Sequence, residues 1–226
     1  MKYARIGPHA NERPAVLDSR GRYRDISAII SDIGPETLME LDARMQGVSI
    51  DDLPMLSDNA RIGPPIARVG KFICVGLNYR DHAKESSMAV PTEPVLFLKA
   101  TSAICGPNDP IMMPRGGQKL DWEVELGLVI GRACSYVDER SALNHVAGAV
   151  LVNDVSERAF QLERGGQWDK GKGCDTFGPV GPWLVTPAEL SPLDDVRLWC
   201  AVNDRRMQDA RTSDMIFNCA YLVHYI

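Results

Sequence analysis

A row of acidic residues within an apolar stretch restricts the fold of this chain more than any other feature of its sequence. Residues 118–131 are rich in aliphatic, β-branched and aromatic side chains and end in glycine, which predicts a β-strand. Because side chains alternate between the two faces of a strand, Asp121, Glu123 and Glu125 are expected to point the same way. Residues 126–130 carry apolar side chains on both faces, which indicates that the strand runs into the protein interior.

Such a row of carboxylates has two interpretations. Two carboxylates about 5 Å apart repel each other by about 3 kcal/mol at an effective dielectric constant of about 20, so a partly buried row needs a proton or a cation. Glu123 and Glu125 could converge on one hard divalent cation, which takes oxygen ligands. The alternative is a row of exposed acids on a solvated sheet edge. This segment alone favours the exposed row, and the motifs described below favour the cation.

Composition limits the classes of protein to which the chain can belong. Its 226 residues are 45% hydrophobic with a net charge of −5, which fits a soluble globular protein with one large domain and an appendage. The negative charge and the scattered Lys and Arg residues argue against nucleic acid or an anionic membrane as a partner. The six cysteines lack metal or redox spacing, which predicts free thiols in a reducing compartment. With neither a signal-peptide core nor an apolar run of spanning length, we expect a cytoplasmic protein.

The chain is expected to divide into two parts. Residues 1–60 predict a small α+β domain, with a hairpin over 15–26 and a helix over 35–46. The Gly/Pro-rich residues 61–70 predict a linker. In residues 71–226 short apolar runs alternate with turns and few helical patterns interrupt them, which favours a β-rich sandwich or roll over a doubly wound parallel sheet.

A histidine and a glutamate follow the first strand predicted after the linker. His82 and Glu85 are three residues apart, so on a helix they lie on one face. A carboxylate next to an imidazole raises its basicity and fixes its tautomer, as proton removal from water requires. A surface ion pair without a catalytic role is an equally good interpretation of this pair alone.

A further carboxylate follows a buried strand. Residues 146–153 are apolar on both faces until they end in asparagine, and Asp154 comes next. An ionised aspartate at the end of a buried strand is costly unless it is paired or binds a metal. It could cap the following turn, or it could be a third oxygen ligand with Glu123 and Glu125, leaving the remaining octahedral positions of a magnesium ion to water and substrate.

A glycine-rich segment over 167–182 is predicted to be a structured loop rather than a regular element. Two lysines lie in it. Lys170 is expected to be solvated, whereas Lys172, between two glycines, is the better candidate for a buried cation that faces a substrate oxyanion.

Together these segments resemble the fumarylacetoacetate hydrolase family. The resemblance runs in order from about residue 71 to the end, through Val75-Gly76-Leu77-Asn78-Tyr79-Arg80-Asp81-His82, Asp121-Trp122-Glu123-Val124-Glu125-Leu126, Asn153-Asp154-Val155-Ser156, Gly171-Lys172 and Phe177-Gly178-Pro179. It implies an α+β, mostly β fold: a mixed β-roll or β-sandwich catalytic domain with short helices, preceded by a small α+β N-terminal domain. It also implies a homodimer and a bound Mg²⁺ or Mn²⁺.

The resemblance also implies roles for individual residues. By matching motifs, the metal ligands are Glu123, Glu125 and Asp154; the water-activating pair is His82 and Glu85; the oxyanion or enolate stabiliser is Lys172; and the substrate-binding residues are Lys99, Arg158, Gln161 and Arg80. The implied activity is hydrolysis of a C–C bond in a 2,4-dioxo acid, of the acylpyruvate or 2,4-diketo-3-deoxy sugar acid type, to pyruvate and a carboxylic acid.

Other activities of the family use the same metal-binding carboxylates without attack by water, and the presence of His82 and Glu85 favours hydrolysis over them. These other activities are decarboxylation of oxaloacetate, isomerisation of 2-hydroxyhepta-2,4-diene-1,7-dioate and cleavage of ureidoglycolate. The sequence departs from the family pattern at Gly173, where serine is common, and it lacks a final section with a Thr-Gly-Thr-Pro strand. If that section is absent from the protein, we expect an open pocket and low activity. A third hypothesis is therefore an inactive truncated relative that acts as a binding or oligomerisation partner.

Overall fold

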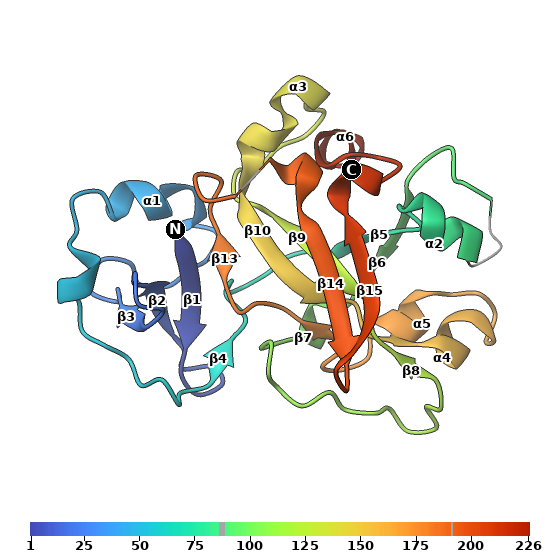
Figure 1. Cartoon of the computed structure of the whole chain (residues 1–226), viewed down its shortest axis with the longest axis horizontal. Helices are drawn as coiled ribbons and strands as arrows, with labels where there is room; N and C mark the ends of the chain where they lie inside the picture. The colour runs from blue at the N-terminus through green and yellow to red at the C-terminus, as the bar shows by residue number, and fades with distance from the viewer. Residues whose placement is uncertain (86–88, 191) are drawn as a thin grey trace.

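A seven-stranded sheet forms the centre of the protein in this computed structural model, which describes residues 1–85, 89–190 and 192–226 (Figure 1). Its strand order is β3-β2-β1-β13-β10-β9, with β4 paired to β1. The strands are β1 (Lys2–Ile6), β2 (Arg13–Leu17), β3 (Tyr23–Asp25), β4 (Ile62–Gly63), β9 (Val124–Ile130), β10 (Val146–Asn153) and β13 (Leu184–Val185). The fold is mostly β with short helices, as the sequence predicts.

The N-terminal strands share this sheet with the rest of the chain. The predicted hairpin is present as β2 and β3, and β1 beside it pairs antiparallel with β13 through Tyr3 and Leu184. β13 in turn pairs with β10, where Gly148 is required because a Cβ there would lie 2.4 Å from the carbonyl oxygen of Val185. The division predicted at residue 60 is therefore not a boundary of the sheet.

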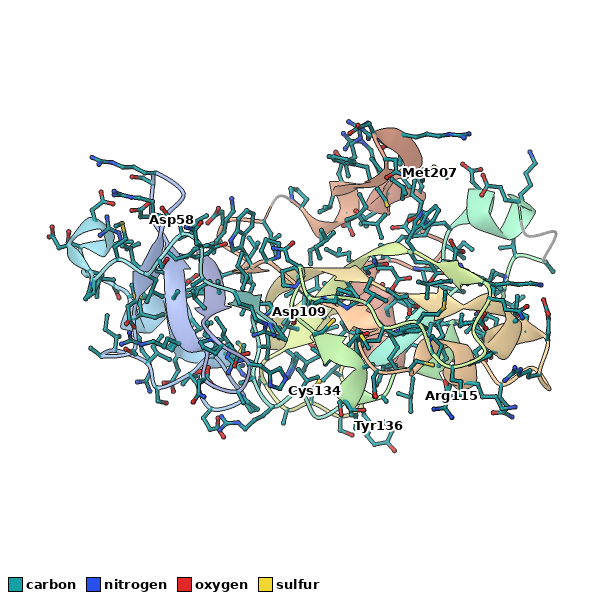
Figure 2. The ribbon with its side chains drawn as sticks, turned by 90° about the horizontal axis from the view of Figure 1, so that it is seen from below. Asp58, Asp109, Arg115, Cys134, Tyr136 and Met207 are labelled. Atoms are coloured by element: carbon teal, nitrogen blue, oxygen red, sulfur yellow. The ribbon has the colours of Figure 1, made fainter. Side chains whose placement is uncertain are left out.

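The main hydrophobic core also crosses that division. Its buried side chains come from the first 45 residues, from β10 and from residues 180–184: Tyr3, Val16, Ile26, Ile30, Ile33, Leu38, Leu41, Met45, Ala147, Val150, Val152, Val180 and Leu184. Burial of apolar side chains is the main favourable term in folding, so the N-terminal segment and the central strands stabilise each other. Arg61 adds an ionic link, because it pairs with Glu12 (2.7 Å) and with Asp109 (2.6 Å), which lies near the middle of the molecule in Figure 2.

In the described part of the chain, four further sheets have two strands each. They are β5 (Ile73–Gly76) with β6 (Val95–Leu98), β7 (Ile104–Cys105) with β12 (Gly178–Pro179), β8 (Leu120–Asp121) with β11 (Ser156–Glu157), and β14 (Arg197–Val202) with β15 (Arg205–Arg211). The single strand predicted over 118–131 is thus two strands, β8 and β9. The strand is interrupted between β8 and β9 because two backbone N–H groups bind side chains instead of a neighbouring strand. The N–H of Trp122 donates to the Asp121 carboxylate, and the N–H of Glu123 donates to the Asn153 amide oxygen.

The α-helices are short and lie at the periphery of the sheets (Figure 1). They are α1 (Leu41–Arg44), α2 (Arg80–Glu85), α3 (Glu139–Ala142), α4 (Arg158–Leu162), α5 (Asp169–Lys172) and α6 (Cys219–Tyr225). The helix expected over 35–46 is shorter than predicted, with a 3₁₀ turn at Leu38–Glu40 before α1. Among the described residues, no helix has both the length and the apolar character needed to cross a membrane.

Candidate active site

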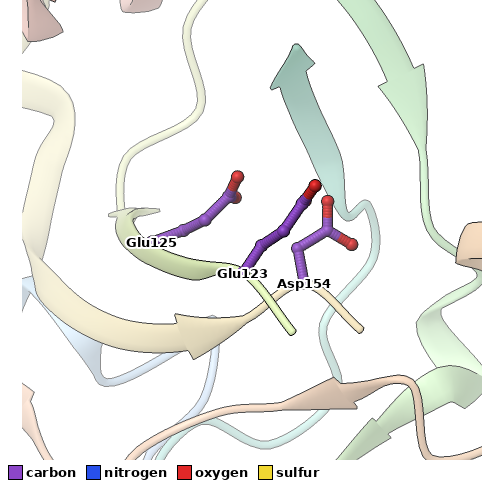
Figure 3. A group of neighbouring side chains, drawn as sticks. All are labelled: Glu123, Glu125 and Asp154. Atoms are coloured by element: carbon purple, nitrogen blue, oxygen red, sulfur yellow. The ribbon is translucent and has the colours of Figure 1, made fainter. Parts of the chain in front are cut away.

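Three carboxylates meet where β9 and β10 pair. β10 ends at Asn153, which lies opposite Val124 at the start of β9, so Asp154 adjoins Glu123 and its backbone N–H donates to the Glu123 carbonyl (2.9 Å). One ligand oxygen of each of Glu123, Glu125 and Asp154 lies within 4.8 Å of the others (Figure 3). The structure therefore brings together the three carboxylates to which the sequence assigned one role.

Two lysine ammonium groups contact this acidic cluster. Lys172 Nζ lies 2.5 Å from Glu123 Oε2 and 2.7 Å from Asp154 Oδ2. Lys99 Nζ lies 2.6 Å from the other oxygen of Asp154. Both lysines and Asp154 are buried, with 2%, 2% and 0% of their surfaces exposed, so Coulomb attraction between them is weakly screened.

Lys172 is presented by a short helix rather than by the irregular loop that the sequence predicted. α5 packs against α4 and β11 at Gly171, where a Cβ would lie 2.5 Å from the Glu157 carbonyl oxygen and 2.6 Å from the Gln161 backbone nitrogen. The glycine before Lys172 thus permits the close helix packing that directs the lysine toward the carboxylates. The Lys172 ammonium also lies 5.0 Å from the ring centre of Phe97, within cation–π range.

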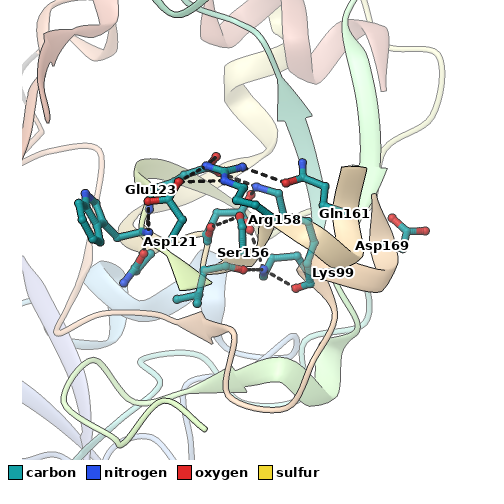
Figure 4. A network of polar contacts seen from close by, with 12 residues as sticks. Lys99, Asp121, Glu123, Ser156, Arg158, Gln161 and Asp169 are labelled. Carbon is teal, nitrogen blue, oxygen red and sulfur yellow. Dashed lines mark hydrogen bonds and ion pairs between the residues drawn. The ribbon is translucent and has the colours of Figure 1, made fainter. Parts of the chain in front are cut away.

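Arg158 joins a further acid to the cluster (Figure 4). Its guanidinium contacts Glu123 Oε1 at 2.6 Å and Asp121 Oδ2 at 2.7 Å, and it donates to Gln161 Oε1 at 2.9 Å. Asp121 therefore pairs with Arg158 and is not part of the group of three carboxylates, which consists of Glu123, Glu125 and Asp154. Arg158 and Gln161, predicted to contact substrate, lie beside the cluster, and Gln161 is buried.

Glu157 supports this arrangement, and the sequence analysis did not identify it. The side chain is fully buried. One oxygen accepts the backbone N–H groups of Gln118 (2.8 Å) and Lys119 (2.6 Å), and the other accepts that of Phe160 (2.6 Å), so Glu157 caps α4. It thereby connects the segment before β8 to the helix that carries Arg158. Its position directly before a helix was the available sequence signal.

Glu125 is the carboxylate of the cluster whose ionised form is most disfavoured. Burial, and then Asp154 and Glu123, raise the pKa of Glu125 to about 8. Burial disfavours the charged form of Lys172, but Glu123 and Asp154 outweigh it, so the pKa of Lys172 lies above its ordinary value. Among the described residues Glu125 has no ion pair or hydrogen-bond donor, which makes it the least satisfied carboxylate of the cluster.

Helix α2 begins near the cluster. Burial, and then the charge of Glu125, raise the pKa of Tyr79 to about 12, which places Tyr79 within electrostatic reach of Glu125. Asn78 fixes this turn by exchanging two 2.9 Å hydrogen bonds with the backbone of Phe217. Leu77, directly before Asn78, has a φ of 55°, which is unusual for a residue other than glycine and is found at functional turns.

The predicted water-activating pair is only partly described. The side chain of His82 lies outside the described part of the structure. Glu85 and Arg80 lie on α2 with exposed side chains, and among the described residues neither pairs with the acidic cluster. The catalytic roles of His82 and Glu85 and the substrate contact of Arg80 therefore stay predictions.

The donor set fits a hard divalent cation. Carboxylate oxygens are the ligands that Mg²⁺ and Mn²⁺ prefer, at about 2.0 to 2.2 Å, and two oxygens on one such ion are at most about 4.4 Å apart. The separations within the cluster, all within 4.8 Å, therefore need only small rotations of the side chains.

Comparisons with known proteins agree with this geometry. The family model for the C-terminal region of fumarylacetoacetate (FAA) hydrolase matches residues 71–226. A provisionally named hydrolase of Burkholderia ambifaria (strain MC40-6) is 53% identical over 227 residues, which cover 100% of this chain and 80% of the relative.

Solved structures show the same fold. Fumarylacetoacetate hydrolase from the psychrophile Exiguobacterium antarcticum superposes with a TM-score of 0.83 at 33% identity, over 99% of this chain and 80% of that one. 2-Hydroxyhepta-2,4-diene-1,7-dioate isomerase from Mycobacterium marinum superposes with a TM-score of 0.72 at 32% identity, over 100% of this chain and 80% of that one. From the family model, the sequence relatives and the fold, the chain belongs to the fumarylacetoacetate hydrolase family.

Proposed function

We propose that the protein hydrolyses a C–C bond of a 2,4-dioxo acid, such as an acylpyruvate, to pyruvate and a carboxylic acid. The observation that supports this proposal is the convergence of Glu123, Glu125 and Asp154 within 4.8 Å, next to the buried ammonium of Lys172. The three carboxylates would hold a Mg²⁺ or Mn²⁺, which would supply Lewis acidity toward the oxygens of the substrate.

The residues of the chain carry the remaining steps of the proposed reaction. His82, oriented by Glu85, takes a proton from a water molecule that attacks the 4-carbonyl carbon. The C3–C4 bond then breaks, the acyl carbon leaves as a carboxylic acid, and C3, which keeps the electron pair, takes up the proton held by His82 to give pyruvate. Lys172 stabilises the negative charge that develops on the substrate oxygen.

Substrate position is assigned to groups at the edge of the cluster. Arg158 lies 2.6 Å from Glu123 and is fixed by Asp121 and Gln161, so its guanidinium is held where a substrate carboxylate would approach the three acids. The partner of the protein in this proposal is a small oxo acid, and we propose a homodimer as its assembly.

The proposed reaction can be tested with acetylpyruvate as substrate. In the presence of Mn²⁺, equal amounts of pyruvate and acetate are expected, and in H₂¹⁸O one labelled oxygen enters the acetate. Glu125→Ala should lower kcat/KM by roughly 10³-fold or more and abolish Mn²⁺ binding, because it removes a cation ligand. His82→Ala should stop the formation of pyruvate but keep Mn²⁺ binding.

A matched control for Glu125→Ala is Glu163→Ala, since Glu163 is an exposed glutamate that pairs only with Lys119 among the described residues. This control variant should keep both turnover and Mn²⁺ binding. Failure of wild-type protein with Mn²⁺ to consume acetylpyruvate or longer acylpyruvates would exclude the proposed hydrolysis.

The second candidate is isomerisation of an unsaturated 2-hydroxy dioic acid, which the similarity to the Mycobacterium marinum isomerase favours. This reaction uses the same carboxylates but needs no attack by water. Consumption of 2-hydroxyhepta-2,4-diene-1,7-dioate without incorporation of ¹⁸O, together with inactivity on acylpyruvates, would support it over hydrolysis.

A further inference from the structure

Lys99 is a buried ammonium group that the proposed reaction does not use. It follows β6, and its backbone N–H donates to the Phe72 carbonyl (3.0 Å). Its side chain is enclosed: 0% of the side-chain surface is exposed, and the 2% given above for the whole residue is backbone. An ammonium group in such a place costs free energy unless the protein provides partners for it.

The chain provides three acceptors for the three N–H groups of Lys99. Its ammonium donates to Asp154 Oδ1 (2.6 Å), to the Val155 carbonyl (3.0 Å) and to the Lys172 carbonyl. A lysine has three donors and no acceptor. Because all three are used within the protein, Lys99 has none left for a substrate, and its environment favours a role other than the substrate contact implied by the family resemblance.

The three acceptors come from two segments that must be held together for the site to exist. Asp154 and Val155 follow β10, whereas Lys172 is the last residue of α5. The Lys172 ammonium returns to the other oxygen of Asp154 at 2.7 Å, so the contacts form a closed ring through both lysines and the aspartate. In this ring Lys99 fixes the backbone of Lys172 relative to the carboxylate that its side chain contacts.

We propose that Lys99 is a positioning residue that sets the place of the Lys172 ammonium relative to Asp154. Removal of Lys99 leaves Asp154 with one cation instead of two and frees the carbonyl end of α5. The backbone of Lys172 is then no longer held in place, and its side chain samples positions away from the substrate oxygen. The kinetic part of this inference rests on the proposed function, whereas its structural part does not.

The structural part is tested by NMR of the lysine ammonium groups in metal-free protein. Wild type should give two slowly exchanging ammonium signals, assigned to the two lysines with Lys99→Met and Lys172→Met. In Lys99→Met the remaining Lys172 signal should shift and lose its protection. A Lys172 signal that keeps its position and its exchange rate in Lys99→Met would overturn the proposal.

The kinetic part is tested by a double-mutant cycle on acetylpyruvate. Lys172→Met should lower kcat by roughly 100-fold or more and Lys99→Met by roughly 10-fold or more, with KM little changed. Because Lys99 acts through Lys172, the double variant should be no slower than Lys172→Met within about threefold. Multiplication of the two losses in the double variant would instead indicate a general structural role and contradict the proposal.

Lys170→Met is the matched control, because Lys170 lies on the same helix but is exposed and donates to the Arg164 carbonyl. It should leave the Lys172 signal and kcat unchanged. If Lys99→Met does not fold, Lys99→Gln keeps a donor of similar length and should show a smaller shift of the Lys172 signal. In wild type, rapid exchange of the Lys99 ammonium protons would still exclude the enclosed position of Lys99 and with it the proposal. Lack of turnover by wild type would exclude the proposed function alone, since the NMR result decides the role of Lys99 separately.

Discussion

Two buried carboxylates in this protein, Asp18 and Asp154, have opposite relations to their surroundings. Asp18 lies in the turn between β2 and β3, and its side chain accepts backbone N–H groups from Arg20 and Arg22 and guanidinium groups from Arg22 and Arg24. All its donors come from the next six residues of the chain. Asp154 instead forms ion pairs with two lysines from distant segments and lies beside two further acids.

The difference is one of charge balance. Burial would raise the pKa of Asp18, but the N–H groups of Arg22, Arg24 and Arg20 outweigh it and hold the pKa below its usual range. At the other site the cations pair with Glu123 and Asp154 but, among the described residues, not with Glu125, whose pKa is raised to about 8. A local turn can thus satisfy a buried acid completely, whereas a surplus of buried acids is a means to bind a cation.

The largest expected effect on stability concerns the satisfied carboxylate. Asp18→Ala leaves two arginines and two backbone N–H groups without their acceptor, and removal of one partner of a buried ion pair is strongly destabilising. We expect Tm to fall by about 10 °C in thermal unfolding followed by circular dichroism. Asp58→Ala is the control, since Asp58 is exposed at the surface of the same N-terminal region (Figure 2) and its loss should change Tm by less than about 2 °C. Equal Tm values for the two variants would refute the contrast.

Glu157 tests whether the pKa of a buried carboxylate depends on its own hydrogen-bond donors or on its distance from the acidic cluster. It lies next to the acidic cluster but, like Asp18, accepts several N–H groups. Burial acts to raise its pKa, but the backbone N–H groups of Gln118, Lys119 and Phe160 outweigh it and lower the pKa. We therefore expect Glu157→Gln to destabilise the protein by about 1 to 3 kcal/mol at pH 7, measured by urea unfolding.

The pH dependence of this loss follows from its sign. A carboxylate with a lowered pKa in the folded state stabilises the protein above its unfolded pKa of about 4.5, and this contribution is lost as the pH falls through the folded value. The difference between wild type and Glu157→Gln should therefore shrink below about pH 4. A difference that stays constant from pH 7 to pH 3 would show that shape rather than charge matters at this position.

The same contrast explains what could be predicted from the sequence. Glu123 and Glu125 were recognisable from the two-residue period of a strand, and Asp154 from its place after an apolar run. That β9 and β10 pair with Asn153 opposite Val124 could not be derived, because it depends on contacts between distant segments. The resemblance to a family supplied the assignment of one site to all three acids.

The features that could not be predicted from the sequence share one physical cause. The break between β8 and β9, the arginine partner of Asp121 and the enclosure of Lys99 all arise from side chains that meet only after the chain has folded. The inclusion of β1 in the central sheet has the same origin, since its partner β13 lies near the other end of the chain. Local composition carries no information on such pairings, so the hairpin of β2 and β3 was predicted more accurately than the extent of β8 and β9.

The smallest expected effect, and the one with the opposite sign, concerns Glu125. Its pKa is raised in the folded protein, so between about pH 4.5 and pH 8 the folded state binds more protons than the unfolded state and stability falls as the pH rises. Glu125→Gln removes both the burial of this charge and its repulsion by Asp154 and Glu123. In EDTA at pH 8 we expect Tm to rise by about 2 to 4 °C, although the variant loses activity.

The increase in Tm should depend on pH in a way that Glu163→Gln, at an exposed and paired glutamate, does not reproduce. At pH 5 wild-type Glu125 is protonated, so the variant and wild type should have nearly equal Tm values in EDTA. Addition of Mn²⁺ at pH 8 should reverse the order, because only the wild type keeps the full set of carboxylates that binds the ion. A Glu125→Gln variant that is less stable than wild type in EDTA at pH 8 would mean that Glu125, like Asp18, has its partners within the chain, and the two carboxylate sites would no longer differ in kind.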